Sequence, residues 1–426
     1  MIRWAAVAAT VATMGAANAA VAGPPQPGAE GKPRSPIEHF IVLMQENHSF
    51  DNYFGTYPGA DGVPRGTCLP AGRSCVRPFH LGSRGIPDLA HDGRVQRMQY
   101  AGGRMDGFVR AASAGRQAVE RSVMGYYDER DLPFYWNVAD EYVLFDRFFA
   151  SAAAGSVANH VAWVSGTPGR PADDMSTIFD RLESSGVSWK FYVEDFDPTR
   201  AFTPERGADR SAQAVRVPLL NLPRYVQSRR LFAHIVDLRE YYEDLQHGSL
   251  PQVAYIVPAG ASEHPPTRLK SGEELVRSLV TALMRSPAWS SSAFMWTYDE
   301  WGGWFDHVRP PKVGGARLGF RVPALLVSPY ARRGHVESTR LDTSSIPSFI
   351  QRNWGLRPLP RSEARAKTLE RAFDFSRPPR RARLVPATRG LRRGREARRW
   401  VIYTGYGGAL LFSGTIFGLA LRRRDP

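Results

Sequence analysis

A short apolar segment that turns polar almost at once is the feature that most constrains how this chain can fold. Residues 40–44 are all apolar, a run typical of one fully buried strand, and Glu46 and Asn47 follow closely. In an open α/β sheet, ligands bind just beyond the carboxyl ends of the strands, where such a strand would place these two side chains. A carboxylate beside a carboxamide offers the oxygen ligands that Mg²⁺, Ca²⁺ and Mn²⁺ prefer. The alternative is a strand followed by a solvated turn, because such polar pairs are common in loops.

Later segments of the chain also read as strands, and most are followed at once by polar residues or by Gly and Pro: residues 187–193, 252–257, 292–298 and 322–327. Between two of them, Ser271 and Glu274 form a capping box that opens an apolar-periodic helix, which Pro287 closes. A strand, a helix and a strand at this spacing are typical of a parallel crossover. We therefore expect one α/β domain over residues 37–375, with a central, mostly parallel sheet flanked by helices and an irregular Gly- and Arg-rich insertion over residues 57–125.

The N-terminal region has the features of an export signal. Residues 1–22 contain Arg3, an uncharged alanine-rich run and an Ala-Asn-Ala cleavage site, and residues 23–36 are predicted to form a Pro- and Gly-rich linker. The two cysteines, Cys68 and Cys75, lie in a Gly- and Pro-rich loop and fit a local disulfide, which persists in oxidising compartments. We therefore expect an exported protein. The alternative for the first segment is an alanine-rich helix of the mature protein.

The C-terminal region has the features of a membrane anchor. Residues 376–399 hold a dense run of arginines with prolines and are predicted to form a tether. Residues 400–421 are predicted to form a transmembrane helix, because about 20 uncharged residues can cross a bilayer and aromatic residues lie near its start. A basic tail, residues 422–426, follows. We expect this helix to anchor the protein on the periplasmic or cell-surface side. The alternatives are a buried core helix and a tail that is removed after sorting.

The chain carries a formal net charge of +15, and only five of its basic residues are lysines. A basic balance points to polyanionic partners, which include nucleic acid, anionic lipid and phosphate-bearing substrates. An arginine-rich codon bias is the alternative. Nucleic-acid binding is disfavoured, because the arginines are not interleaved with aromatic residues and the chain is expected to be exported.

A second pair of acids comes directly after a predicted strand. Asp299 and Glu300 follow residues 292–298, just as Glu46 and Asn47 follow the first strand. Together these four side chains would form an oxygen-rich cluster able to hold one divalent metal ion. Its identity stays open among Mg²⁺, Ca²⁺, Mn²⁺ and iron. The alternative is that each pair lies in solvent at the end of its strand.

Ser156 is the candidate nucleophile. It follows a turn of small residues and precedes a predicted helix over residues 157–164. A hydroxyl at a helix N-terminus faces backbone N–H groups that suit a phosphate and the charge that builds on it; the alternative is an N-cap serine. His264 and His307 each lie in a Gly- or Pro-rich loop after a strand and are the candidates for proton transfer. For either histidine the alternative is a structural role.

Residues 46–62, ENHSFDNYFGTYPGADG, resemble the opening signature of the bacterial phospholipase C and acid phosphatase family, whose members share an alkaline-phosphatase-like α/β fold. Residues 105–108 and 124–136 resemble further segments of that family. Residues 299–308 resemble its Asp-Glu-x-Gly-Gly-x-x-Asp-His-Val signature. The motifs arrive in the family's order within residues 37–355.

The segment that begins at Ser156 is similar to the family's Thr/Ser-x-Pro-Asn-Arg motif. Ala158 and His160 stand where the family has Pro and Arg, so His160 would have to replace any phosphate contact of that arginine. The resemblance implies four catalytic residues and four metal ligands: Ser156, Asn159, His264 and His307, and Glu46, Asn47, Asp299 and Glu300.

The reaction that the resemblance implies is in-line attack by Ser156 on phosphorus, giving a phosphoserine that water then hydrolyses. The family includes enzymes that act on phospholipid diesters and enzymes that act on phosphomonoesters. The expected membrane anchor and basic surface favour phospholipase C-type cleavage of phospholipid head groups, and a broad-specificity acid phosphatase is the alternative. A second alternative, motivated by Ala158 and His160, is a catalytically impaired, membrane-anchored protein that binds polyanions.

Overall fold

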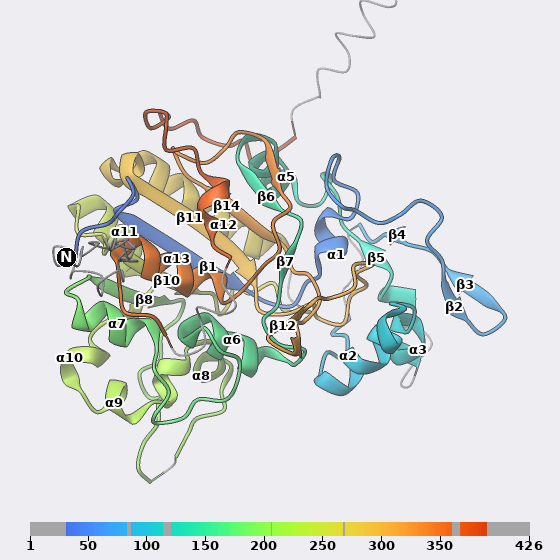
Figure 1. Ribbon diagram of the computed structural model, residues 1–426, viewed down its shortest axis with the longest axis horizontal. Coiled ribbons are helices and arrows are strands. Elements are labelled where there is room, and N and C mark those ends of the chain that lie inside the picture. Colours follow the sequence, from blue (N-terminus) through green and yellow to red (C-terminus); the bar gives the residue numbers. More distant parts are fainter. Residues whose placement is uncertain are drawn as a thin grey trace, which may run out of the picture.

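An eight-stranded sheet forms the centre of the structure, a computed structural model that describes residues 31–82, 87–113, 121–205, 207–266, 269–359 and 367–389 (Figure 1). The strands lie in the order β15-β6-β14-β11-β1-β10-β8-β9. Their bounds are β1 (His39–Gln45), β6 (Val143–Phe145), β8 (Trp189–Val193), β9 (Ile235–Asp237), β10 (Val253–Val257), β11 (Ser292–Tyr298), β14 (Ala324–Val327) and β15 (His335–Glu337).

Strand β14 runs against the direction of every other strand in this sheet. It pairs antiparallel with both β11 and β6, whereas β1 pairs in parallel with β10 and β11. The connection from β11 to β14, described throughout, contains the small hairpin of β12 (Lys312–Val313) and β13 (Ala316–Arg317) but no helix. A parallel neighbour would need a crossover, usually a helix, whereas an antiparallel neighbour does not. The sheet is therefore mostly parallel, as predicted, and is mixed because of β14 alone.

Helices cover both faces of the sheet. Successive strand residues point to opposite faces, and the ring of Tyr255 on β10 packs 4.5 Å from the ring of Trp163 on α6 (Ser156–Ser165). On the other face, the hydroxyl of Tyr192 on β8 donates to Asp244 on α11 (Arg239–His247) at 2.6 Å. Every residue of β10 and β11 is buried. Burial on two faces explains why these strands are near-continuous apolar runs rather than alternating ones.

The other elements surround this sheet. The helices are α1 (Phe50–Phe54), α2 (Gly93–Tyr100), α3 (Phe108–Ser113), α5 (Pro133–Glu141), α7 (Ile178–Ser184), α8 (Ala212–Arg216), α9 (Pro223–Val226), α10 (Arg229–Phe232), α12 (Leu269–Arg285) and α13 (Ser345–Trp354). The short strands are β2 (Leu69–Ala71), β3 (Ser74–Val76), β4 (Phe79–His80), β5 (Gly125–Tyr126), β7 (Phe148–Phe149) and β16 (Leu341–Asp342).

The predicted strands are confirmed as β1, β8, β10, β11 and β14. The predicted helix corresponds to α12, which begins at Leu269, so Ser271 lies inside the helix rather than at its N-cap. Within the Gly- and Arg-rich insertion, the disulfide between Cys68 and Cys75 joins the two sides of the β2–β3 hairpin, as predicted. This hairpin projects from the body of the molecule (Figure 1).

The membrane helix is the part of the predicted fold that the structure does not support. None of the helices in the described ranges is long and apolar enough to cross a membrane. Residues 400–421, to which the sequence assigned that helix, lie outside those ranges, as do the predicted signal at residues 1–22 and the basic tail at 422–426. The described part of the predicted tether, residues 376–389, lies against α5, where Arg389 pairs with Asp140.

A buried glutamate on α12 ties this helix to α5 and makes stability depend on pH. The carboxylate of Glu273 accepts from the backbone N–H of Phe134 (2.8 Å) at the start of α5. Burial raises the pKa of Glu273 to about 7, although this hydrogen bond works against the shift. The folded protein thus holds this proton more tightly than the unfolded chain. The resulting stabilisation is complete below pH 4.5, the ordinary value, and is lost as the pH rises through 7.

Replacing Glu273 with glutamine is expected to remove that pH dependence. Between pH 4.5 and pH 8, the free energy of unfolding should fall by about 3 kcal/mol less in Glu273→Gln than in the wild type, since one pKa unit corresponds to about 1.4 kcal/mol. Urea unfolding across this pH range measures the difference. Glu274→Gln is the matched control, because the neighbouring side chain is 53% exposed. If the free energy of unfolding fell equally with pH in wild type and Glu273→Gln, the expectation would be contradicted.

Candidate active site

The carboxyl ends of β1 and β11 bring acidic residues together at one edge of the sheet. Gln45 pairs with Tyr298 in parallel register, so the residues that follow them, Glu46 and Asp299, leave the sheet side by side. The backbone N–H of Asn47 donates to Oδ1 of Asp299 at 3.3 Å. The structure therefore joins the two polar segments that the sequence predicted to meet.

Two residues with unusual backbone conformations hold these strand ends in contact. Asn47 has a φ of 70°, in the left-handed region that asparagine tolerates better than most residues. Gly302 has a φ of 62° and lies directly against Asn47, where a Cβ atom would approach the carbonyl oxygen of Asn47 to 2.0 Å. Only glycine allows the loop after β11 to pass this close.

Three polar side chains converge at this edge. The Asn47 amide lies 3.0 Å from Oδ1 of Asp299 and 3.1 Å from Oε1 of Glu300. With its oxygen turned towards the two carboxylates, this amide would complete a set of three oxygen ligands for a divalent cation. Oδ2 of Asp299 is also buried without a hydrogen-bond partner. These residues therefore fit a divalent cation.

The charges of the buried acids lead to the same conclusion. Burial and the charge of Asp299 raise the pKa of Glu300 well above its ordinary value, and burial and the charge of Glu46 raise the pKa of Asp299. Burial acts in the same direction on Glu46, but a hydrogen bond with His160 and the charge of Arg216 outweigh it and hold the pKa of Glu46 well below its ordinary value. A bound cation would offset the repulsion among the carboxylates.

Ser156 lies beside these acids. It is the first residue of α6, and Gly155, not Ser156, occupies the N-cap position. Burial and the charge of Glu46 raise the pKa of Asp299, and the nearby Ser156 hydroxyl acts in the opposite direction. The N-cap alternative is therefore excluded, and the hydroxyl lies where helix N–H groups can stabilise a phosphate.

Asn159 shapes the turn that leads into α6. Its Oδ1 accepts from the backbone N–H of Ala152 (2.9 Å), and its Nδ2 donates to the carbonyl oxygen of Ala154 (3.1 Å). The side chain is fully buried. These contacts suit a residue that positions Ser156, and a direct catalytic role for Asn159 stays a prediction.

His160 points from α6 into the acid cluster. Its Nε2 lies 3.4 Å from Oε1 of Glu46 and 3.9 Å from Oδ2 of Asp299, and the side chain is fully buried. Glu46, His160 and Asp299 offer ligand atoms that all lie within 4.8 Å of one another. Where the family motif has arginine, this chain therefore places an imidazole next to the candidate cation ligands.

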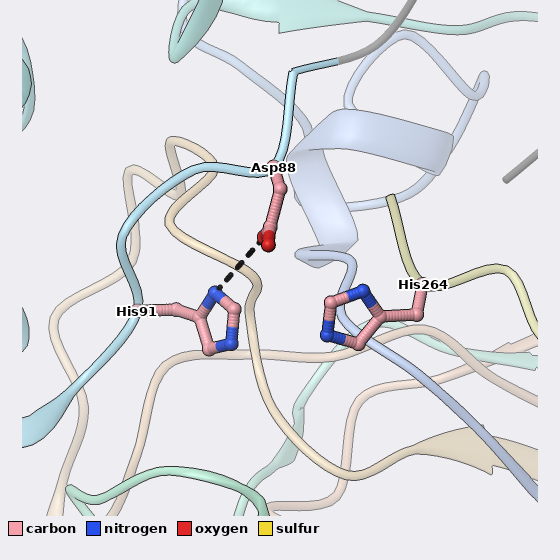
Figure 2. A group of neighbouring side chains, drawn as sticks. All are labelled: Asp88, His91 and His264. Carbon is pink, nitrogen blue, oxygen red and sulfur yellow. Dashed lines mark ion pairs between the residues drawn. The ribbon is translucent and has the colours of Figure 1, made fainter. Parts of the chain in front are cut away.

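Two further histidines lie on the outer side of the acids. Figure 2 shows Asp88, His91 and His264 pointing towards one another from different segments, with Oδ1 of Asp88 3.7 Å from Nδ1 of His91. The two imidazole rings are 5.6 Å apart, and Nε2 of His91 lies 3.7 Å from Oε1 of Glu300. Nε2 of His264 is 2.9 Å from the Asn47 amide. His91 was missed from the sequence, because it lies in the insertion and outside the matched motifs.

A serine hydroxyl at a helix N-terminus, beside buried acids and imidazoles, suits the transfer of a phosphoryl group. The sequence profile of the Phosphoesterase family matches residues 37–357. The chain belongs to the Phosphoesterase family. It is therefore a hydrolase that acts on phosphoric esters, as the resemblance predicted.

This phosphoesterase is similar to bacterial proteins named phospholipase C. It is 28% identical over 413 residues to Phospholipase C A of Mycobacterium tuberculosis, covering 80% of this chain and 78% of that protein. It is 29% identical over 426 residues to Non-hemolytic phospholipase C of Burkholderia pseudomallei. That match covers 80% of this chain and 59% of the Burkholderia protein. A crystal structure of a protein in the alkaline phosphatase superfamily from Vibrio parahaemolyticus matches with a TM-score of 0.38 and 12% identity, covering 79% of this chain and 70% of that one. A likeness this weak carries no argument about the site.

The structure does not bring His307 to the acid cluster of the phosphoesterase. Nδ1 of His307 lies 2.7 Å from Oδ2 of Asp51, and Nε2 lies 3.3 Å from Oδ1 of Asp61. The fully buried Arg321 joins this second cluster through Asp51 (2.9 Å) and Asp306 (3.0 Å). Burial lowers the pKa of His307, but the hydrogen bond with Asp51 and the charges of Asp51 and Asp306 together outweigh burial, so the net shift is upward. These contacts suit a structural role, and a catalytic role for His307 stays a prediction.

Arg216, on α8, is a site residue that the sequence did not reveal. Its Nε and Nη2 donate to the two carboxylate oxygens of Glu46, at 2.5 Å and 3.1 Å. Nη1 donates to the carbonyl oxygen of Pro258 (3.0 Å), and Nη2 also lies 3.4 Å from Oγ of Ser262, in the loop that carries His264. Arg216 therefore connects the end of β1 with the loop after β10. No motif marks it, because its partners lie far away in the sequence.

Replacing Arg216 with methionine is expected to destabilise the phosphoesterase by about 3 kcal/mol or more, because it leaves the buried Glu46 carboxylate without its partner. Urea unfolding at neutral pH measures the change. Arg309→Met is the control, because the exposed Arg309 bonds only the Tyr100 hydroxyl among the residues described and should cost less than about 0.5 kcal/mol. Equal stability of Arg216→Met and wild type would show that Glu46 does not depend on this guanidinium.

Proposed function

We propose that this phosphoesterase is a phospholipase C-type enzyme that cleaves phospholipids at the phosphate, through a phosphoserine at Ser156. The observation that carries the proposal is the position of Ser156 at the start of α6, near the buried Asp299 carboxylate. The names of the relatives support a phospholipid substrate.

In the proposed reaction, Oγ of Ser156 attacks phosphorus, the bond from phosphorus to the glycerol oxygen breaks, and the head group stays on the phosphoserine. Water then releases the phosphorylated head group and regenerates the serine. A divalent cation held by Glu46, Asn47, Asp299 and Glu300 would lower the pKa of the serine hydroxyl and offset charge on the phosphoryl oxygens. The N–H groups at the start of α6 would bind those oxygens.

His264 is the proposed proton donor to the departing alkoxide. It lies 2.9 Å from the Asn47 amide, whereas His307 contacts Asp51 and Asp61 in the second cluster. General acid catalysis of this kind typically contributes about 10²- to 10⁴-fold.

Substrate comparison tests the proposal against its alternative, a broad-specificity acid phosphatase. The purified full-length protein, loaded with divalent metal, is incubated separately with dihexanoyl-phosphatidylcholine, dihexanoyl-phosphatidylglycerol and p-nitrophenyl phosphate. Release of dihexanoylglycerol from either lipid, and its absence with Ser156→Ala, is the expected result. Hydrolysis of p-nitrophenyl phosphate alone would establish the monoesterase instead.

Export is also part of the proposal. The disulfide between Cys68 and Cys75 supports it, because structural disulfides are rare in the cytosol of most organisms. Fractionation of producing cells tests it: the mature chain should be found outside the cytoplasm with both thiols oxidised. A cytoplasmic protein with two free thiols would contradict export.

A further inference from the structure

A pocket of about 760 Å³ opens beside Ser156, and most of its lining residues have no role in the chemistry described above. It lies between the first turns of α6, helix α8 and two loops, residues 169–171 and 208–210. Ser156 itself lines the pocket. When the phosphate of a substrate lies within reach of the Ser156 hydroxyl, one of the groups esterified to that phosphate can therefore extend into the pocket. The volume is within the range of small-molecule sites in proteins.

The walls of this pocket are mostly aliphatic. Val157 and Val161 of α6 face it together with Val215 of α8, and alanines and one proline fill the spaces between them. Val157 is 40% exposed, and in the described part of the chain only one other large apolar side chain, Leu384, is exposed to a comparable degree. An aliphatic side chain left in water next to a nucleophile is stabilised when an apolar ligand covers it.

The charged groups at the pocket are unsuited to a cationic head group. Arg170 and Arg210 are both exposed lining residues, and within the described ranges neither forms an ion pair with a carboxylate. The carboxylate of Asp209, the acid among the lining residues, accepts from the backbone N–H of Ser211 at 2.7 Å. No aromatic side chain is among the lining residues, although aromatic faces are what proteins use to bind quaternary ammonium groups.

We infer that this pocket binds the acylated glycerol of a phospholipid rather than its head group. The acyl methylenes pack against the valines of α6 and α8, and the two arginines donate to the ester carbonyl oxygens at the mouth. This inference rests on the proposed function and deepens it, because it assigns one half of the substrate to a particular part of the protein.

Binding of the product alcohol tests the inference without turnover. Isothermal calorimetry on the full-length protein, loaded with divalent metal, measures dihexanoylglycerol and, separately, phosphocholine. Dihexanoylglycerol should bind to the wild type, and Val157→Ser should weaken its binding about 3- to 10-fold, since only part of the valine surface is exposed for the ligand to cover. Phosphocholine binding should be the same in both proteins. Leu384→Ser is the matched control, because it removes the other exposed apolar side chain outside this pocket and should leave both affinities unchanged.

The outcomes separate the inference from the proposed function. Failure of the wild type to bind dihexanoylglycerol, equal binding by Val157→Ser, or a loss of phosphocholine affinity in that variant would each overturn the assignment of the pocket. A protein that releases dihexanoylglycerol from lipid but shows one of these results is a phospholipase C with its acyl site elsewhere. A protein that binds dihexanoylglycerol through Val157 but releases none from lipid retains the pocket, while the proposed activity fails.

Discussion

Replacing Ser156 with alanine is expected to lower kcat for every phosphoric ester that this enzyme hydrolyses by about 10⁴-fold or more. The alanine has no hydroxyl to attack phosphorus, and the loss of a nucleophile typically removes nearly all catalysis beyond binding and charge stabilisation. The fold should be unaffected, because Ser156 does not cap α6 and Gly155 occupies the N-cap position. Initial rates measured with the best substrate, at saturating metal, give the ratio.

Two other variants sharpen this result. Ser165→Ala, at the opposite end of the same helix, removes a hydroxyl that donates to the carbonyl oxygen of Val161 and should retain most of the activity. Ser156→Thr keeps a hydroxyl at the reacting position and should retain a measurable part of it. More than about a tenth of wild-type activity in Ser156→Ala, with correct folding by circular dichroism, would exclude the phosphoserine pathway.

Replacing Asp299 with asparagine is expected to reduce kcat about 10³-fold and to abolish stoichiometric metal binding. The Asp299 carboxylate accepts from the backbone N–H of Asn47 and lies near Ser156, so it connects the candidate cation ligands with the nucleophile. Elemental analysis of the purified protein measures the amount of metal bound per chain directly. Dialysis of the wild type against a chelator should likewise remove activity, and a divalent cation should restore it in the wild type alone.

Thermal unfolding provides an independent measurement for Asp299. Burial and the charge of Glu46 raise the pKa of Asp299, so its ionised form is disfavoured in the metal-free protein. The neutral asparagine relieves that repulsion, and metal-free Asp299→Asn should therefore have a higher Tm than metal-free wild type at pH 8. Added metal should raise the Tm of the wild type, since it binds only the folded state, and should not raise that of the variant. Equal metal content in wild type and Asp299→Asn would show that Asp299 is not a ligand of the cation.

The meeting of Glu46, Asn47, Asp299 and Glu300 could be predicted because it depends on local order. Each pair follows an apolar strand directly, and parallel strands end at one edge of a sheet. The contact of Ser156 with Asp299 was predictable only in outline, from a turn of small residues before a helix. The sequence did not distinguish His264 from His307, because both histidines follow strands within matched motifs. The structure separates them: Nε2 of His264 lies 2.9 Å from the Asn47 amide, whereas His307 pairs with Asp51.

Other parts of the site come from segments with no local signal. His91 lies in the insertion, and Arg216 lies on a helix of five residues; each reaches the acids only because the chain between has folded. The antiparallel direction of β14 could not be predicted from the sequence either, because an apolar strand has the same composition whichever way it runs.

The sequence by itself determined the α/β class, the strands, the disulfide and the acidic pairs at the strand ends, since each depends on residues close together in the chain. Tertiary structure alone decided the mixed sheet, the partner of each buried charge and the pocket beside Ser156. These depend on which distant segments pack together, and packing is decided by the whole core rather than by any one stretch of residues.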